Sequence, residues 1–238
     1  MLTSSLRYNT KNLKRIFEFL MNNGYSCVND PAEMQNGRKK VFVRHDVDVS
    51  LKMASQLARL ESTIGLETVF FVMINSPFYN IHESEQKAML QELKDGGFQI
   101  GLHANVQKNV EISEIEALVQ VQRNILEISL GSPISLVSFH QPSSREMKFV
   151  FKDKSLFNVY QLSEMGVIYL SDSNMQFDIR LLQESVKQSK NMQLLIHPVW
   201  WYSEVENPGE VWEKMIFEKA SEIRETIRAT ERSYEGNS

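Results

Sequence analysis

Cysteine is scarce in this sequence, long apolar runs are absent, and positive charge is not in excess. Its 238 residues include one cysteine, Cys27, which excludes an internal disulfide framework and a thiolate zinc cluster. The longest uninterrupted apolar run, residues 69–74, has six residues and is far too short to span a bilayer. Lys and Arg number 26 against 30 Asp and Glu, without the basic excess of most nucleic-acid-binding proteins. We therefore expect a globular protein with no nucleic-acid partner and no membrane span.

The sequence carries no marker of targeting or of a domain boundary. Residues 1–15 are polar and basic with no apolar h-region, so we expect no signal peptide and a cytoplasmic location. No repeat, low-complexity tract or linker interrupts the sequence, and α/β barrels of this length often form one domain. We therefore predict a single domain over residues 1–238 and leave the oligomeric state open.

Segments with helical spacing of apolar residues alternate with short apolar, β-branched segments. The expected helices are residues 10–23, 51–64, 84–95, 115–126, 180–189 and 210–231. The expected strands are residues 40–45, 68–74, 98–103, 134–140, 167–171 and 192–197. Residues 141–166 show no regular pattern. This alternation predicts a mostly parallel sheet of six or seven strands, either open or closed as a barrel.

Histidines gather at the predicted strand ends. Four of the five occupy the last or next-to-last position of a predicted strand, namely His45, His103, His140 and His197. Asp46, Asp48 and Asp172 fall at the same edge of the predicted sheet. Because active sites of parallel α/β folds form at the carboxyl ends of the strands, the sequence predicts a functional site there.

Arg44, Asp46 and Asp48 alternate along one extended segment, so we expect their side chains to share a face. Two carboxylates that close repel each other unless a cation or hydrogen bonds intervene. A divalent metal resolves this conflict by taking one carboxylate as a ligand and leaving the other as a base, which Arg44 holds in position. The alternative is that Asp46 or Asp48 caps the helix that begins near residue 50, with Arg44 as a structural partner.

The other histidines have similar surroundings. Asn105 follows His103, and a proline follows both His140 and His197 within two residues, which ends the strand and stiffens the loop. A lone histidine at such a place is more often a hydrogen-bonded structural residue than a ligand. The paired aspartates at the same edge favour the functional interpretation.

Three adjacent aromatic residues, Trp200 to Tyr202, follow the last predicted strand. They can form a stacking platform for a sugar ring. Three consecutive side chains cannot all face one way, however, so we expect at least one of them to pack in the core.

Taken in order, the segments between about residues 40 and 202 resemble the motifs of the polysaccharide deacetylase superfamily, the group with NodB homology. The first motif, usually T-F-D-D-G, is similar to residues 44–48, which implies Asp46 as the base and Asp48 as a metal ligand. The second is a strand that ends in His, with another His four residues later. It is similar to residues 100–107 and implies His103 as a ligand, but Gln107 replaces the second histidine.

The later motifs match unevenly. The third, R-x-P-like, is similar to residues 139–142, with His140 in place of arginine. The last, a Leu-rich strand that ends in His, matches residues 194–197 and implies His197 as the general acid. The segment of residues 169–173 stands where the fourth motif is expected and matches it poorly; it contains Asp172.

The resemblance implies a distorted (β/α) barrel with about seven parallel strands and one divalent metal ion. Asp48, His103 and His140 are the expected ligands, with His140 replacing the missing histidine of the second motif. Alternatively, Asn105 or water completes the metal shell, and His140 hydrogen-bonds Asp46 or the substrate. Nitrogen and oxygen ligands without thiolate suit Zn²⁺, with Co²⁺, Ni²⁺, Mn²⁺ or Fe²⁺ as alternatives.

The function implied is metal-dependent hydrolysis of an N-acyl (acetyl) group on a small-molecule, lipid-linked or nucleotide-linked sugar, in bacterial surface-polysaccharide (lipopolysaccharide or O-antigen) biosynthesis. Four residues are expected to contact the substrate, namely Asn105, Asp172, Trp200 and Tyr202. One alternative is a catalytically inert sugar-binding relative; Gln107 favours it, whereas retention of Asp46 and His197 speaks against it. The other is a hydrolase of a different amide that uses the same site.

Overall fold

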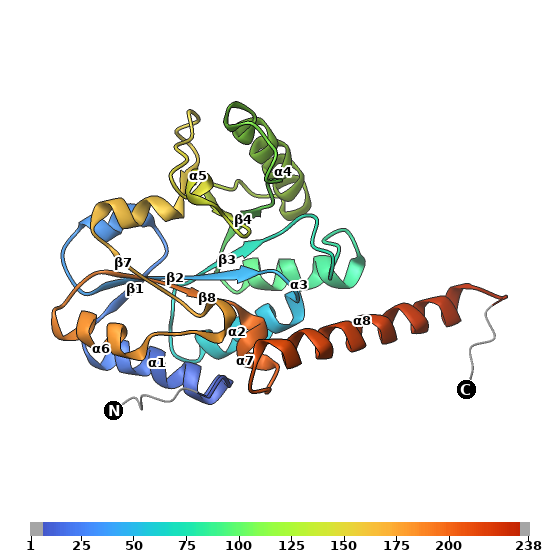
Figure 1. Ribbon diagram of the computed structural model, residues 1–238, viewed down its shortest axis with the longest axis horizontal. Helices are drawn as coiled ribbons and strands as arrows, with labels where there is room; N and C mark the ends of the chain where they lie inside the picture. Colours follow the sequence, from blue (N-terminus) through green and yellow to red (C-terminus); the bar gives the residue numbers. More distant parts are fainter. Residues whose placement is uncertain (1–6, 234–238) are drawn as a thin grey trace.

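The computed structural model describes residues 7–233, in which helices alternate with the strands of one sheet (Figure 1). The strands are β1 (Ser26–Val28), β2 (Lys40–Val47), β3 (Val69–Val72), β4 (Gln99–Ala104), β5 (Leu136–Phe139), β6 (Phe157–Asn158), β7 (Ile168–Ser171) and β8 (Met192–Ile196). The α-helices are α1 (Thr10–Asn22), α2 (Leu51–Ser62), α3 (Ser84–Asp95), α4 (Ile115–Leu130), α5 (Ser144–Met147), α6 (Ile179–Lys187), α7 (Pro198–Tyr202) and α8 (Pro208–Thr230). Short 3₁₀ helices are η1 (Pro31–Gln35), η2 (Ile112–Glu114), η3 (Val159–Met165) and η4 (Ser173–Met175).

The sheet is parallel throughout and runs in the order β6-β5-β4-β3-β2-β8-β7. The N-terminal half of β2 also pairs with β1, and its C-terminal half pairs with β3. The sheet curls into a half-barrel with helices around it (Figure 1). This arrangement confirms the predicted distorted (β/α) barrel with about seven parallel strands.

The middle strands are buried along almost their entire length, as their continuous apolar runs predict. Every residue of β3 and β8 is buried, and so is β2 from Val41 to Val47. Inside the curl, Phe42 and Phe71 belong to a compact apolar cluster. A Cβ added to Gly101 would lie 2.5 Å from the Phe71 ring, so the glycine on β4 leaves the space that this ring fills.

Ser50 caps helix α2, because its side chain accepts a hydrogen bond of 3.2 Å from the backbone N–H of Met53. A serine in this position satisfies one of the free amides of the first turn. Asp46 and Asp48 are therefore not the caps of α2, and the capping role considered for them from the sequence is wrong.

The segment without a regular pattern, residues 141–166, contains α5, β6 and η3. Strand β6 has two residues, and Asn158 within it is buried and donates through Nδ2 to the carbonyls of Glu146 and Phe149. The segment thus adds an edge strand that the sequence did not predict. It also carries Tyr160 to the carboxyl end of the sheet.

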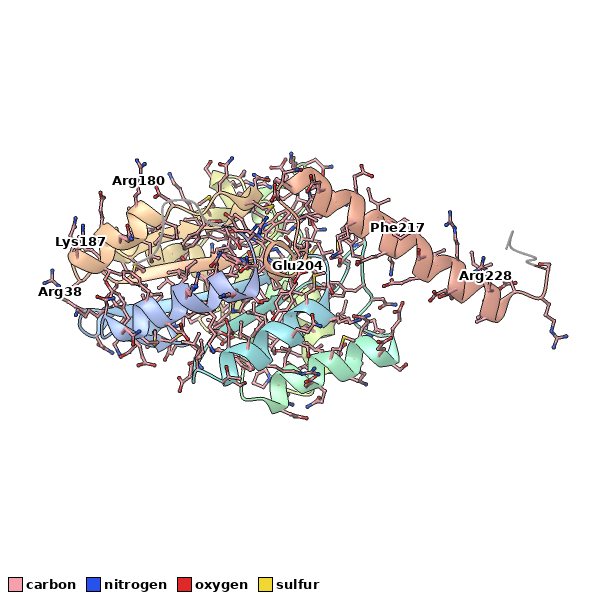
Figure 2. All side chains as sticks on the ribbon, turned by 90° about the horizontal axis from the view of Figure 1, so that it is seen from below. Arg38, Arg180, Lys187, Glu204, Phe217 and Arg228 are labelled. Atoms are coloured by element: carbon pink, nitrogen blue, oxygen red, sulfur yellow. The ribbon has the colours of Figure 1, made fainter. Side chains whose placement is uncertain are left out.

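Helix α8 extends away from the rest of the molecule (Figure 1). Its buried residues are Val211 and Met215, both near its beginning, and Phe217 and Arg228 lie along the extended part (Figure 2). Among residues 7–233, no helix has the length and apolar composition that crossing a bilayer requires.

Candidate functional site

Side chains at the carboxyl ends of the strands line a cavity of about 620 Å³. Among them are six residues predicted from the sequence, namely Asp46, Asp48, His103, His140, His197 and Trp200. The structure thus brings together residues from β2, β4, β5 and β8 that are far apart along the chain. Four other predicted site residues are not in this lining, namely Arg44, Asn105, Asp172 and Tyr202.

Asp48 lies at the centre of the histidines. Its Oδ1 is 2.9 Å from His103 Nε2 and 3.2 Å from His140 Nδ1. Burial opposes the negative charge of Asp48, but the contacts with His103 and His140 outweigh burial and hold its pKa well below the usual range. The same contact with Asp48 raises the pKa of His140. The three side chains form one electrostatic unit.

This unit fits a divalent metal ion. One ligand atom from each of Asp48, His103 and His140 lies within 4.8 Å of the others. Ligand atoms about 2.0 Å from a tetrahedral ion are about 3.3 Å apart, close to the two distances measured from Asp48. In addition, Asp48 Oδ1 is buried and receives no well-aligned hydrogen bond from residues 7–233. One carboxylate and two imidazoles are a donor set typical of Zn²⁺ sites.

Asp46 lies beside the three candidate ligands and is 2% exposed. Ser138 Oγ donates to its Oδ2 at 3.1 Å, and His103 Nδ1 is 3.8 Å from the same oxygen. Ser138 is therefore a site residue that the sequence analysis missed. It stands two residues before His140 on the same strand, and this spacing was a usable signal.

Arg44 is fully buried directly behind Asp46. Its Nη2 lies 3.5 Å from Asp46 Oδ2, and its guanidinium carbon is 4.3 Å from the ring centre of Tyr160 and 5.7 Å from that of Tyr169. Aromatic faces stabilise a buried cation. Although burial opposes its charge, the neighbouring Asp46 holds the pKa of Arg44 above the usual value. Arg44 remains charged beside the carboxylate.

His197 is held by a buried carboxylate. Its Nδ1 lies 2.6 Å from Asp172 Oδ1, and its backbone N–H donates to Asp172 Oδ2 at 2.9 Å. Trp201 Nε1 donates to the same Oδ2 at 2.7 Å. Burial would lower the pKa of His197, but the Asp172 carboxylate outweighs burial and raises it to about 9. At neutral pH the His197 ring is therefore protonated.

The position of Asp172 corrects one expectation. The sequence analysis made it a substrate contact, whereas its exposure is 0% and it lies behind His197. Its carboxylate hydrogen-bonds the backbone N–H and the ring of His197 and the indole N–H of Trp201. Asp172 orients and charges the imidazole instead of reaching into the cavity.

The three adjacent aromatic residues have different environments. Trp200 lines the cavity, whereas Trp201 is fully buried. Trp212, at the beginning of α8, also lines the cavity and contacts Trp200 edge to face, with ring centres 5.4 Å apart. Phe78 stacks on Trp212 at 6.2 Å. An aromatic wall therefore exists, but it includes two residues that the sequence analysis did not assign to the site.

Tyr202 and Asn105 are outside this wall. Tyr202 lies in the field of Glu61, and burial raises its pKa to about 12. The backbone N–H and C=O of Asn105 both hydrogen-bond the side chain of Gln122, at 3.0 Å each. Neither residue lines the cavity, and the substrate contacts expected of Tyr202 and Asn105 stay predictions.

His45 was grouped with the other strand-end histidines, and the structure separates it from them. Its Nε2 lies 2.8 Å from Glu61 Oε1 of α2, and both side chains are 0% exposed. Its ring packs on Phe70 with centres 4.5 Å apart. Because successive strand residues face opposite sides, His45 points away from the side that Arg44 and Asp46 share. Three histidines, not four, meet at the cavity.

Comparison with known proteins finds no matching family model and no matching curated protein. Several solved structures are similar in fold. A CE4 esterase from Streptococcus mutans is 16% identical, with a TM-score of 0.48 over 88% of this chain and 90% of that one. A chitin deacetylase from Colletotrichum lindemuthianum is 12% identical, with a TM-score of 0.45 over 75% and 82%.

A CE4 family pseudoenzyme from Bacillus anthracis is 14% identical, with a TM-score of 0.46 over 78% of this chain. This chain spans only 62% of the length of that structure. All three TM-scores are below 0.5. What the site does must be argued from its own residues.

Proposed function

We propose that the protein is a metal-dependent hydrolase that removes an N-acyl group from a sugar. The observation that carries this proposal is the meeting of Asp48, His103 and His140 beside a carboxylate, Asp46, and a protonated imidazole, His197, in one cavity. Ligands, base and acid are the parts that metal-assisted amide hydrolysis requires.

Asp48, His103 and His140 would hold one divalent ion, with Zn²⁺ as the best match to the donor set. When bound, the ion supplies Lewis-acid polarisation of the acyl carbonyl and a lowered pKa for water. Gln107, which replaces the second histidine of the family motif, is exposed. The third proposed ligand is therefore His140, at the end of β5, and not a residue of the loop after β4.

Asp46 is the proposed general base. Its Oδ2 accepts from Ser138 and lies 3.5 Å from the Arg44 guanidinium, so two groups hold the carboxylate in one orientation. A carboxylate oriented in this way can accept the proton of the attacking water. Arg44 and Ser138 act through Asp46 and are positioning residues.

His197 is the proposed general acid. Its Nδ1 is engaged by Asp172, which leaves Nε2 facing the cavity, 3.7 Å from Asp48 Oδ2. Because the Asp172 carboxylate keeps the ring protonated, Nε2 can donate a proton to the leaving amine. Without such a donor, the C–N bond would have to break with release of an amine anion (RNH⁻), which is a very poor leaving group.

The aromatic wall is the proposed sugar site. Trp200, Trp212 and Phe78 present apolar surface beside the reacting groups, which suits the apolar face of a pyranose ring. The family resemblance extends the proposal to an acetylated sugar, free, lipid-linked or nucleotide-linked, in cytoplasmic assembly of bacterial surface polysaccharide.

The first test is metal content. The purified chain is reconstituted with Zn²⁺, dialysed and analysed by mass spectrometry of the metal. We expect one ion per chain and loss of that ion in both His103→Ala and His140→Ala, whereas Gln107→Ala serves as the matched control and keeps it. If His140→Ala retains metal against a chelator as well as the unaltered chain does, the ligand set is wrong.

The second test is acid release from N-acetylated hexosamines and their nucleotide-linked and lipid-linked forms. We expect acetate release by the zinc-loaded chain and none by Asp46→Asn, which should keep its metal because the base is not a ligand. A zinc-loaded chain that binds these sugars without releasing acid would contradict hydrolysis and favour the inert sugar-binding alternative. Release from other amides alone would reassign the substrate.

A further inference from the structure

The extended part of helix α8 exposes an apolar stripe. Ile216, Ala220, Ile223 and Ile227 follow one another at steps of four, three and four residues, the spacing of a coiled-coil seam. Ile216 is 57% exposed and Ile223 is 50% exposed. The neighbouring Phe217 is 70% exposed and projects from the helix (Figure 2).

The residues of α8 that are almost completely buried are Val211 and Met215, and Trp212 packs beside them on Trp200. The extended part of α8, residues 216–230, would be only marginally stable as an isolated helix in water, because most helical stability in proteins comes from packing an apolar face. The stripe therefore needs a partner surface if the extended part of α8 is to persist in solution.

We propose that a second copy of this chain covers the stripe, through antiparallel pairing of the two α8 helices around a two-fold axis. In the register that centres the seam, Ile216 packs near Ile227 of the second copy, and Ala220 packs near Ile223. Each contact occurs twice because of the symmetry. This proposal does not depend on the metal site or on hydrolysis.

Charges along α8 favour the antiparallel direction. From residue 208 to 218 the helix has three acidic residues and one basic residue, whereas from 219 to 230 it has three basic and two acidic residues. The proposed register brings Glu213 near Arg228 of the second copy. A parallel pair would instead place Glu213 beside Glu213 and Arg228 beside Arg228, with like charges together.

The exposed Phe217 gives a further reason for a self-pair. It flanks the seam, and the antiparallel register brings it beside Arg224 of the second copy. A guanidinium over an aromatic face is attractive, and its alkyl stem covers apolar surface. The apolar stripe, the Phe217 ring beside it and the charges along the helix thus all meet complementary groups on an antiparallel second copy of α8.

The primary test is the mass of the full chain in solution, measured by light scattering and analytical ultracentrifugation over a concentration series. We expect a dimer. Ile223→Lys should raise its dissociation constant on the order of 100-fold or more, because the two-fold symmetry removes two buried isoleucines at once. The matched control is Ile128→Lys, at an 83% exposed isoleucine of α4, which should remain dimeric. A monomeric wild type, or a dimeric Ile223→Lys, overturns the proposal.

Charge exchange and cross-linking test the direction. Glu213→Arg and Arg228→Glu should each weaken the dimer, and the double variant should restore it. In a Cys27→Ser background, chains with Ala220→Cys should form disulfides with chains carrying Ile223→Cys in preference to their own kind. Preferential self-cross-linking of either variant contradicts the antiparallel register. A monomer that binds phospholipid vesicles through α8 would assign the stripe to a membrane surface and also overturn the proposal.

Discussion

Two buried histidine–carboxylate pairs lie on neighbouring parts of the same sheet, and they differ in what lies beyond the ring. His197 is 2.6 Å from Asp172 and opens onto the cavity. His45 is 2.8 Å from Glu61 and is enclosed by Phe70 and helix α2, with no exposed surface. The pair itself does not define a catalytic group. The proposed catalytic histidine is distinguished by a second ring nitrogen that reaches the cavity.

The largest expected difference is in turnover. His197→Asn should lower kcat by about 10²–10⁴-fold, because it removes the proposed proton donor. His45→Asn should leave kcat per folded molecule unchanged and reduce stability instead. Steady-state kinetics on active-site-titrated protein, together with thermal melts, measures both. Equal losses of kcat in the two variants would remove the distinction between the pairs.

The next largest expected effect is the loss of folding stability when a buried polar group loses its partner. Glu61→Gln should destabilise the fold by about 1–3 kcal/mol, because it replaces the buried carboxylate that contacts His45 and Thr68 and leaves a buried polar group without its partner; urea unfolding measures this loss. Thr68, whose hydroxyl donates to Glu61 at 2.7 Å, loses its charged acceptor as well. A stability loss below about 1 kcal/mol, as at exposed pairs, would show that this pair is solvated in solution.

The two histidine–carboxylate pairs should also differ in how they affect the pH dependence of activity. With its pKa at about 9, His197 acts as an acid up to that pH, and activity should fall as the pH rises beyond it. Asp172→Asn removes the charge that raises this pKa, so the alkaline limb of kcat/KM should move to lower pH. The raised pKa also means that the stability from the His197–Asp172 pair is complete below the unfolded pKa of about 6.5 and is lost as the pH rises through about 9. An unchanged alkaline limb in Asp172→Asn would assign it to another group.

The smallest expected effects come from the outer hydrogen bonds. Trp201→Phe removes the 2.7 Å donor to Asp172 but keeps most of the packing, and should cost about 10-fold in activity, at the low end for groups that orient an active residue. Thr68→Val, which removes the corresponding donor to Glu61, should cost about 1–3 kcal/mol of stability without a change in kcat. Kinetics and urea unfolding of both variants provide the comparison.

Strand alternation predicted part of the site correctly. Arg44, Asp46 and Asp48 share one side of β2, and the strand-end positions of His103, His140 and His197 led to the cavity. The same alternation excludes His45 from that side, so this error was avoidable from the sequence. Ser138, two residues before His140, was also within reach of the period-two rule.

Other parts of the site were beyond sequence patterns. Tyr160 follows a two-residue strand that has no detectable period. Asp172 is separated from the cavity by the ring that it holds, and a sequence does not reveal which of two polar residues lies in front. Trp212 reaches the cavity only because the beginning of α8 packs back on α7.

The three candidate ligands lie at the ends of three different strands and are separated by long stretches of chain. An ion bound by Asp48, His103 and His140 would hold the ends of two long loops together in the native state. Ligand binding to the native state alone also shifts the folding equilibrium by mass action. Loss of the ion would then act as a folding defect centred on the loops after β4 and β5. In a cell short of metal, abundance of the protein would fall together with its activity.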